Sequence, residues 1–205
     1  SSNEFVAAMY YRIYTEIAFC NEFLRNTTDA KLTSNNITGA DLAEAKYMRA
    51  EARFLRAQSY YHALDLFGNV PFVDETYLPG SPTPPKRIVS ADLFKYVESE
   101  LLAVANDLKD PKTNQYARVD KAAAWTLLAR LYLNAEVYTG TAKNAEVITY
   151  TQKVINAGYG LKTKYADLFL ADNHLNNPEV IMPVAFDGVH IKTFGGTSYL
   201  VHAAV

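Results

Sequence analysis

The sequence predicts a mainly all-α protein of stacked helical hairpins, followed by an irregular, loop-rich C-terminal tail. Apolar residues recur at steps of three and four through most of residues 3–156, which is the spacing of one helical face. Trp125-Thr-Leu-Leu-Ala-Arg-Leu-Tyr132 follows the W-x2-L-G-x2-Y pattern of a tetratricopeptide first helix, with a small Ala129 in the glycine position. From Tyr159 onward the helical spacing is lost. We therefore predict a tetratricopeptide-like helical domain over residues 1–158 and the start of a loop-rich portion over residues 159–205.

The first helix is expected over residues 3–26. Its apolar stripe comprises Phe5, Met9, Ile13, Ile17, Cys20 and Leu24. Cys20 has no histidine or second cysteine near it in the sequence, which favours a small buried hydrophobic residue over a metal ligand. A polar loop is expected over residues 31–37.

A long second helix is predicted from about Gly39 to Phe67. Thr38 followed by Asp41 favours a start there, while Gly68 and Pro71 stop the helix. Two interpretations remain open for Arg53 and Arg56 on its polar face: a solvated charge pattern, or binding to carboxylates of neighbouring helices. Because this helix is expected to pack on both sides, we predict that the two arginines are bound.

The remaining elements are shorter. Four prolines between positions 79 and 85 predict an extended connection, after which Ser90 is a suitable N-cap for a helix to about Leu108. Helices over residues 122–134 and from about residue 143 to Asn156 then form a hairpin. In the tail, residues 167–170 predict a helical turn. Residues 179–187 predict an edge strand at best, because Pro183 interrupts them.

Composition excludes several functional classes. The 205 residues carry 20 basic and 22 acidic side chains, well interspersed, so no basic face predicts nucleic-acid binding. The four histidines are scattered, and no nucleophile elbow, phosphate-binding glycine loop or dinucleotide fingerprint is present. No apolar run approaches the roughly 20 residues that span a bilayer. We therefore expect no catalysis, no cofactor and no metal.

Binding is the positive alternative. Aromatic rings stack on the apolar faces of sugars, and planar polar side chains hydrogen-bond the hydroxyls; the chain has 15 tyrosines. The irregular segments supply both kinds of side chain. The candidate ligand-binding residues are Tyr77, Asp172, Asn173, His174, Phe186, Asp187, His190 and Tyr199.

The amino-acid sequence of the long helix resembles that of the SusD/RagB family of bacterial outer-membrane glycan-binding lipoproteins. The resemblance lies in Arg53-Phe-Leu-Arg-Ala57, Tyr60-Tyr61 and Leu66-Phe-Gly-Asn-Val-Pro-Phe72. Three further stretches resemble the family in the expected order. They are Ile17–Leu24, Ala122–Asn134 and Asn177–Ile181 with the following Phe186-Asp187.

The resemblance implies a surface-exposed outer-membrane protein whose helical domain faces a SusC-like TonB-dependent transporter. Its membrane association would be through a lipidated N-terminal cysteine outside this chain, since Cys20 lies within a helix. Family members are more than twice this length, and the chain begins without a signal segment, so we expect a fragment. The family's signature residues are structural, and none is carried over as a ligand contact.

Our leading hypothesis is non-catalytic capture of oligosaccharide or polysaccharide and its delivery to the transporter. The first alternative is a tetratricopeptide-like scaffold that binds a peptide in the concave groove of its hairpins. The second is a glycoside-active enzyme, which needs a paired Asp/Glu in a cleft. Exposed rings on loops beyond Tyr159 favour sugar, whereas a polar and aromatic lining of the inner helices favours peptide.

Overall fold

The computed structural model describes residues 3–170, 172–186 and 189, and its architecture is almost entirely helical. This confirms the predicted fold class. The elements in chain order are α1 (Glu4–Asn26), α2 (Asp29–Ser34), α3 (Gly39–Phe67), β1 (Val70–Pro71), β2 (Arg87–Ile88), α4 (Ser90–Asp107), α5 (Lys121–Leu133), α6 (Ala135–Thr139), α7 (Asn144–Asn156) and the 3-10 helix η1 (Tyr165–Phe169).

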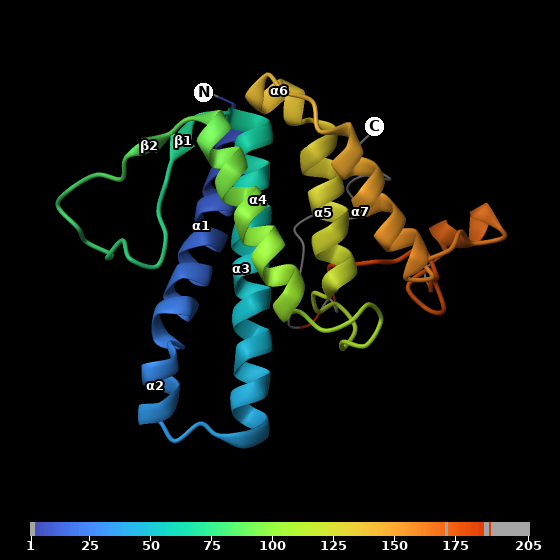
Figure 1. Ribbon diagram of the computed structural model, residues 1–205, viewed down its shortest axis with the longest axis horizontal. Coiled ribbons are helices and arrows are strands. Elements are labelled where there is room, and N and C mark those ends of the chain that lie inside the picture. Colours follow the sequence, from blue (N-terminus) through green and yellow to red (C-terminus); the bar gives the residue numbers. More distant parts are fainter. Residues whose placement is uncertain (1–2, 171, 187–188, 190–205) are drawn as a thin grey trace.

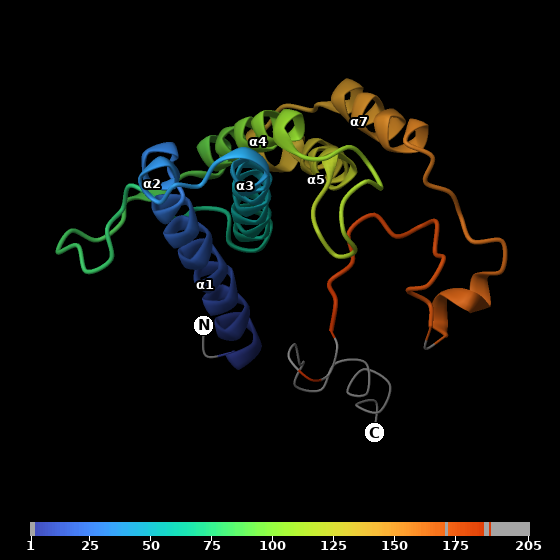
Figure 2. The same ribbon diagram turned by 90° about the horizontal axis from the view of Figure 1, so that it is seen from below.

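The helices form one curved layer. In chain order α1 packs on α3, α3 on α4, α4 on α5, and α5 on α7 (Figure 1). Seen from below, α3, α4, α5 and α7 follow an arc, and the tail after α7 folds back beneath it (Figure 2). Each helix therefore contacts chiefly its neighbours, as expected for stacked hairpins.

The core runs along the middle of this layer. The central α3, α4 and α5 supply most of its largest fully buried side chains, because each packs on helices at both sides. These side chains are Phe54, Tyr60, Leu64, Leu93, Phe94, Val97, Leu101, Leu128 and Leu131. Ala57 and Ala124 are fully buried and let neighbouring backbones approach closely.

Cys20 belongs to the interface between α1 and the rest of the layer. It is 6% exposed, and burial raises the pKa of its thiol to about 11, so it is a neutral thiol at physiological pH. The prediction of a small buried hydrophobic residue is confirmed.

Two predicted faces are only partly correct. Phe5 was expected in the apolar stripe of α1 but is 78% exposed, because the start of α1 extends past its neighbours (Figure 2). Ile148 and Ile155 of α7 are 69% and 62% exposed. Among the described helices α7 closes the layer and packs mainly on α5, so only part of its apolar surface is covered.

Two predictions about how helices begin are wrong. The polar loop expected over residues 31–37 begins with helix α2, in which the Thr28 hydroxyl accepts from the Lys31 amide at 3.4 Å and Leu32 is buried. Ser90 is the first residue of α4 and not its N-cap. The side-chain oxygen of Asn69 accepts from the Ser90 amide at 2.8 Å, so a residue 21 positions earlier satisfies this donor.

The expected edge strand is also absent among the described residues 179–186. Pro183 has no amide hydrogen to donate to a ladder. Ile181 and Met182 pack against the helical core, so helix contacts replace strand pairing.

The end of α3 depends on Gly68. Its φ of 69° and ψ of −94° turn the chain into β1, which pairs antiparallel with β2 through Val70 and Ile88. A Cβ atom at this position lies 3.2 Å from the Ser90 hydroxyl oxygen. Both the backbone conformation and the space favour glycine.

We predict that Gly68→Ala lowers the free energy of unfolding by about 1–3 kcal/mol, because alanine is strained at this positive φ. Urea denaturation followed by circular dichroism measures the change. Gly160→Ala is the matched control, because its Cβ meets no atom within 4 Å and its φ is not in the left-handed region. Equal unfolding midpoints for the two variants would contradict the prediction.

Candidate functional site

A buried arginine connects three helices with the β1–β2 connection. Arg56 of α3 is 3% exposed. Its Nη1 donates to the side-chain oxygen of Asn21 in α1 at 2.8 Å and also to Glu75 in the connection. Its Nη2 donates to Glu100 of α4 at 3.2 Å.

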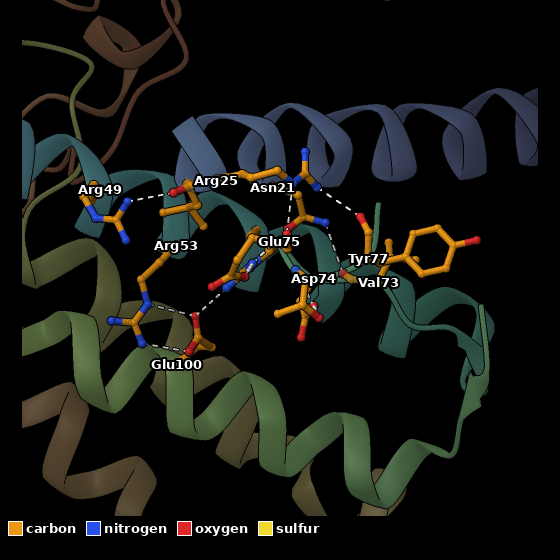
Figure 3. A network of polar contacts seen from close by, with 12 residues as sticks. Asn21, Arg25, Arg49, Arg53, Val73, Asp74, Glu75, Tyr77 and Glu100 are labelled. Carbon is orange, nitrogen blue, oxygen red and sulfur yellow. Dashed lines mark hydrogen bonds and ion pairs between the residues drawn. The ribbon is translucent and has the colours of Figure 1, made fainter. Parts of the chain in front are cut away.

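Arg53 completes the network on the same face of α3 (Figure 3). Its Nε and Nη2 donate to the two carboxylate oxygens of Glu100 at 3.1 and 2.8 Å, a bidentate pair. The prediction that both arginines are bound by neighbouring elements is therefore confirmed.

The backbone of the β1–β2 connection is bound by side chains of α1 and α3. The Tyr60 hydroxyl donates to the Val73 carbonyl at 2.7 Å and accepts from the Val73 amide at 2.8 Å. Arg25 donates to the carbonyls of Glu75 and Tyr77, each at 3.0 Å (Figure 3). These contacts set the path of residues 73–77 through main-chain atoms.

Electrostatics of the network favour its ionised form. Partial burial disfavours the charge of Glu75, but the hydrogen bond and positive charge of Arg56 outweigh it, so the pKa of Glu75 lies below its ordinary value. Burial raises the pKa of Tyr60, which keeps its hydroxyl protonated as the donor to Val73. The charged groups of this network bind one another and hold α1, α3, α4 and the β1–β2 connection together.

Tyr77 does not join the other candidate ligand residues. It is half-buried in the β1–β2 connection, where its hydroxyl donates to the Thr83 carbonyl at 2.8 Å. Figure 1 places this connection and the tail after α7 at opposite sides of the molecule. A single site containing Tyr77 and residues 172–174 is therefore not formed within this chain.

The tail candidates differ in their surroundings. Asn173 donates to the Leu168 carbonyl at 2.7 Å, which commits its amide to the loop itself. Asp172 and His174 are exposed, and Phe186 is 54% exposed. Asp187, His190 and Tyr199 lie outside the described residues.

Sequence reasoning missed an aromatic pair in the tail. Tyr165 and Phe169 of η1 are 73% and 71% exposed, and their ring centroids lie 5.1 Å apart with planes at 63°. Their i, i+4 spacing was the available signal. With Phe186, they are three exposed phenylalanine and tyrosine rings among the described residues beyond Tyr159.

A cavity of about 690 Å³ lies on the inner side of the helical layer. Side chains of α1 and α3 line it, together with residues 117–119 and residues 182–185 of the tail. Its lining has no phenylalanine, tyrosine or tryptophan among the described residues. Its two carboxylates are engaged in the fold: Glu16 accepts from Ser59 at 2.7 Å, and Glu51 pairs with Arg118 at 2.7 Å.

A second cavity, of about 560 Å³, lies where the α4–α5 connection faces the tail. We call it the loop cavity; it is lined by residues from 112–120, Tyr159 and residues from 174–183. His174 is the one sequence-predicted candidate in its described lining.

The described part of the chain contains neither a metal-binding cluster nor a membrane-spanning helix. No group of three or more histidine, cysteine, aspartate or glutamate side chains there is arranged to hold a metal ion. None of the described helices is both long and apolar enough to cross a membrane.

We predict that Arg56→Met destabilises the fold by about 3 kcal/mol or more, because Glu100 is left buried with one cationic partner removed. Urea denaturation measures the loss. Lys95→Met is the control: Lys95 and Asp92 form a pair whose side chains are 72% and 59% exposed, and its removal costs under about 1 kcal/mol. A loss for Arg56→Met no larger than that of the control would contradict the prediction.

A pH dependence follows from Glu75. Because its folded pKa lies below the ordinary value of 4.5, its contribution to stability is complete above that value and is lost as pH falls through the folded pKa. We expect the urea midpoint to fall between about pH 5 and pH 3, and Glu75→Gln to reduce that slope. An unchanged slope in Glu75→Gln would show that other carboxylates account for the acid sensitivity.

We compared the sequence and the fold of this chain with those of known proteins. A scan against models of protein families found no match. The chain is 40% identical over 196 residues to the starch-binding protein SusD of Bacteroides thetaiotaomicron, covering 94% of this chain and 33% of that protein. It is 22% identical to the SusD-like protein P2 of Formosa agariphila, covering 97% of this chain and 37% of that protein.

Solved structures show the same fold. A SusD-like carbohydrate-binding protein from Bacteroides fragilis superimposes with a TM-score of 0.73 at 24% identity, covering 90% of this chain and 34% of that one. A laminarin-binding SusD-like protein superimposes with a TM-score of 0.71 at 23% identity, covering 89% and 38%. The chain spans about one third of the length of the curated relatives that it matches, and across that span it is similar in sequence to SusD and in fold to SusD-like proteins.

Proposed function

We propose that this chain is part of a non-catalytic protein that binds oligosaccharide or polysaccharide at the bacterial cell surface. The observation that carries the proposal is the 40% identity, over 94% of the chain, to a protein named for starch binding. The exposed rings of Tyr165, Phe169 and Phe186 on the described part of the tail add physical support, because exposed aromatic faces suit the apolar faces of sugar rings.

The inner face of the helical layer favours sugar over peptide as the ligand of this protein. A peptide groove is expected to have polar and aromatic side chains on the inner helices. Here the larger cavity has no phenylalanine, tyrosine or tryptophan in its described lining, and residues 182–185 of the same chain form one of its walls. Tyr165, Phe169 and Phe186 instead present exposed rings on the tail.

A glycosidase is the weaker alternative. Such an enzyme needs two carboxyl groups free to act on either side of a scissile bond. Glu16 and Glu51 are the carboxylates of the larger cavity, and both already bind side chains of the fold. They are therefore accounted for by structural roles.

In this proposal the two predicted domains have different roles. Residues 1–158 would form the rigid frame, and residues 159–205 would begin the portion that presents ligand. The whole protein would be a lipid-anchored outer-membrane protein, and a SusC-like TonB-dependent transporter would receive the glycan. The similarity to SusD is the support for the anchor, the location and the partner.

The test is an affinity-gel and calorimetry screen of the chain, and of the longer protein containing it, against starch, laminarin, xyloglucan, mannan and pectin. We expect at least one neutral polysaccharide to retard migration and to give a saturable heat of binding, with no reducing sugar released. Bovine serum albumin is the migration control. Failure of every glycan to bind, together with binding of a peptide library, would overturn the proposal.

A further inference from the structure

The loop cavity has the features of a preformed sugar site, and this inference rests on the proposed glycan-binding function. Its volume of about 560 Å³ lies within the range of small-ligand sites. Like the larger cavity, it is lined by residues from both the helical domain and the tail. Some of its side chains are hydrogen-bonded within the fold, and others are available to a ligand.

The floor of the cavity is built around Asp120. This carboxylate is 5% exposed and caps α5 by accepting from the amides of Ala122 and Ala123 at 2.9 and 3.2 Å. Its other oxygen accepts from the Lys112 amide at 2.9 Å and from the Tyr159 hydroxyl at 3.3 Å. Asp120 therefore fixes the α4–α5 connection and Tyr159 relative to α5.

The tail wall is fastened separately. The Glu179 carboxylate accepts from the Lys162 amide at 2.6 Å, and the Pro178 carbonyl accepts from the Gly160 amide at 3.3 Å. Asn177 braces the turn by donating to the Asn173 carbonyl at 2.9 Å and accepting from the Glu179 amide at 3.0 Å. Both walls are thus held by the chain itself, which lowers the ordering cost of binding.

Four side chains on the rim are available to a ligand. Tyr116 is 58% exposed, and Gln115, His174 and Asn176 are exposed as well. Within the described chain, none of these four side chains donates or accepts a hydrogen bond. One phenol ring, two planar amides and one imidazole are therefore presented together at the mouth of the cavity.

The charges of the cavity favour an uncharged ligand. Lys112 donates to the Gly158 carbonyl, and its Nζ lies 4.5 Å from the centre of the Tyr159 ring. Arg118 pairs with Glu44 and Glu51. These are the lysine and arginine residues of the described lining: Arg118 is neutralised by carboxylates, and one donor of Lys112 is bound to a carbonyl. Uronates and sulfated sugars would find no free arginine in the described lining, and Lys112 as its single cation without a carboxylate partner.

We propose that the loop cavity binds one residue of a neutral glycan, with the Tyr116 ring against the sugar face. Gln115, His174 and Asn176 hydrogen-bond its hydroxyls. The proposal assigns binding roles to three residues that sequence reasoning did not select, Gln115, Tyr116 and Asn176, and places them beside His174, which it did select.

The test compares calorimetric titrations of maltoheptaose, a xylogluco-oligosaccharide and oligogalacturonate into the chain. We expect a neutral oligosaccharide to bind and oligogalacturonate not to bind. Tyr116→Ala should weaken neutral binding about tenfold, because it removes the stacking ring, whereas Tyr116→Phe should retain most of the affinity. Tyr11→Ala is the matched control, since Tyr11 is 69% exposed on α1 and lies outside the cavity lining.

Each result separates the cavity proposal from the proposed function. Unchanged neutral binding in Tyr116→Ala and Gln115→Ala would overturn the cavity assignment and leave glycan binding standing. Equal or stronger binding of oligogalacturonate would overturn the neutral specificity. If neither the chain nor the longer protein binds any glycan, both proposals fail. Circular dichroism of each variant shows whether a loss of binding reflects loss of folding.

Discussion

The buried guanidinium of Arg56 is the constraint on which the rest of the structure depends. An unpaired charge in a protein interior costs several kcal/mol, so Arg56 requires its partners simultaneously. These partners are Asn21 of α1, Glu100 of α4 and Glu75 of the β1–β2 connection. Three elements must dock on α3 for one charge to be satisfied, so a single residue ties α1, α4 and the β1–β2 connection to α3.

The polar groups that stabilise the helical layer are different from those that are available to a ligand. The polar groups around α3 are used to hold helices and to bind the main chain of residues 73–77, so they contribute rigidity and not recognition. Side chains without partners gather elsewhere, on the α4–α5 connection and in the tail. A rigid frame with unpartnered polar and aromatic groups at its edge is suited to ligand binding, because little freedom is lost when the ligand arrives.

The proposed site could be predicted from the sequence only in part. His174 is a candidate from the sequence because it is a polar side chain in an irregular segment of the tail, and it does line the loop cavity. Tyr77 was selected on the same grounds, yet Tyr77 lies with the β1–β2 connection, away from the tail (Figure 1). Composition reports the kind of side chain that a loop carries. It does not report which loops meet, because that depends on how intervening helices pack.

The amino-acid sequence alone determined the helical class, the bounds of α1, α3 and α7 to within about a residue, and the resemblance to the SusD/RagB family. These features are encoded locally, in the spacing of apolar residues and in stop signals such as Gly68. Only the tertiary structure decided that Asn69 satisfies the first amide of α4, that Arg53 and Arg56 share Glu100, and that Tyr116 and His174 line one cavity. Each of these arrangements joins residues 21 or more positions apart, and helical periodicity carries no information about partners at such distances.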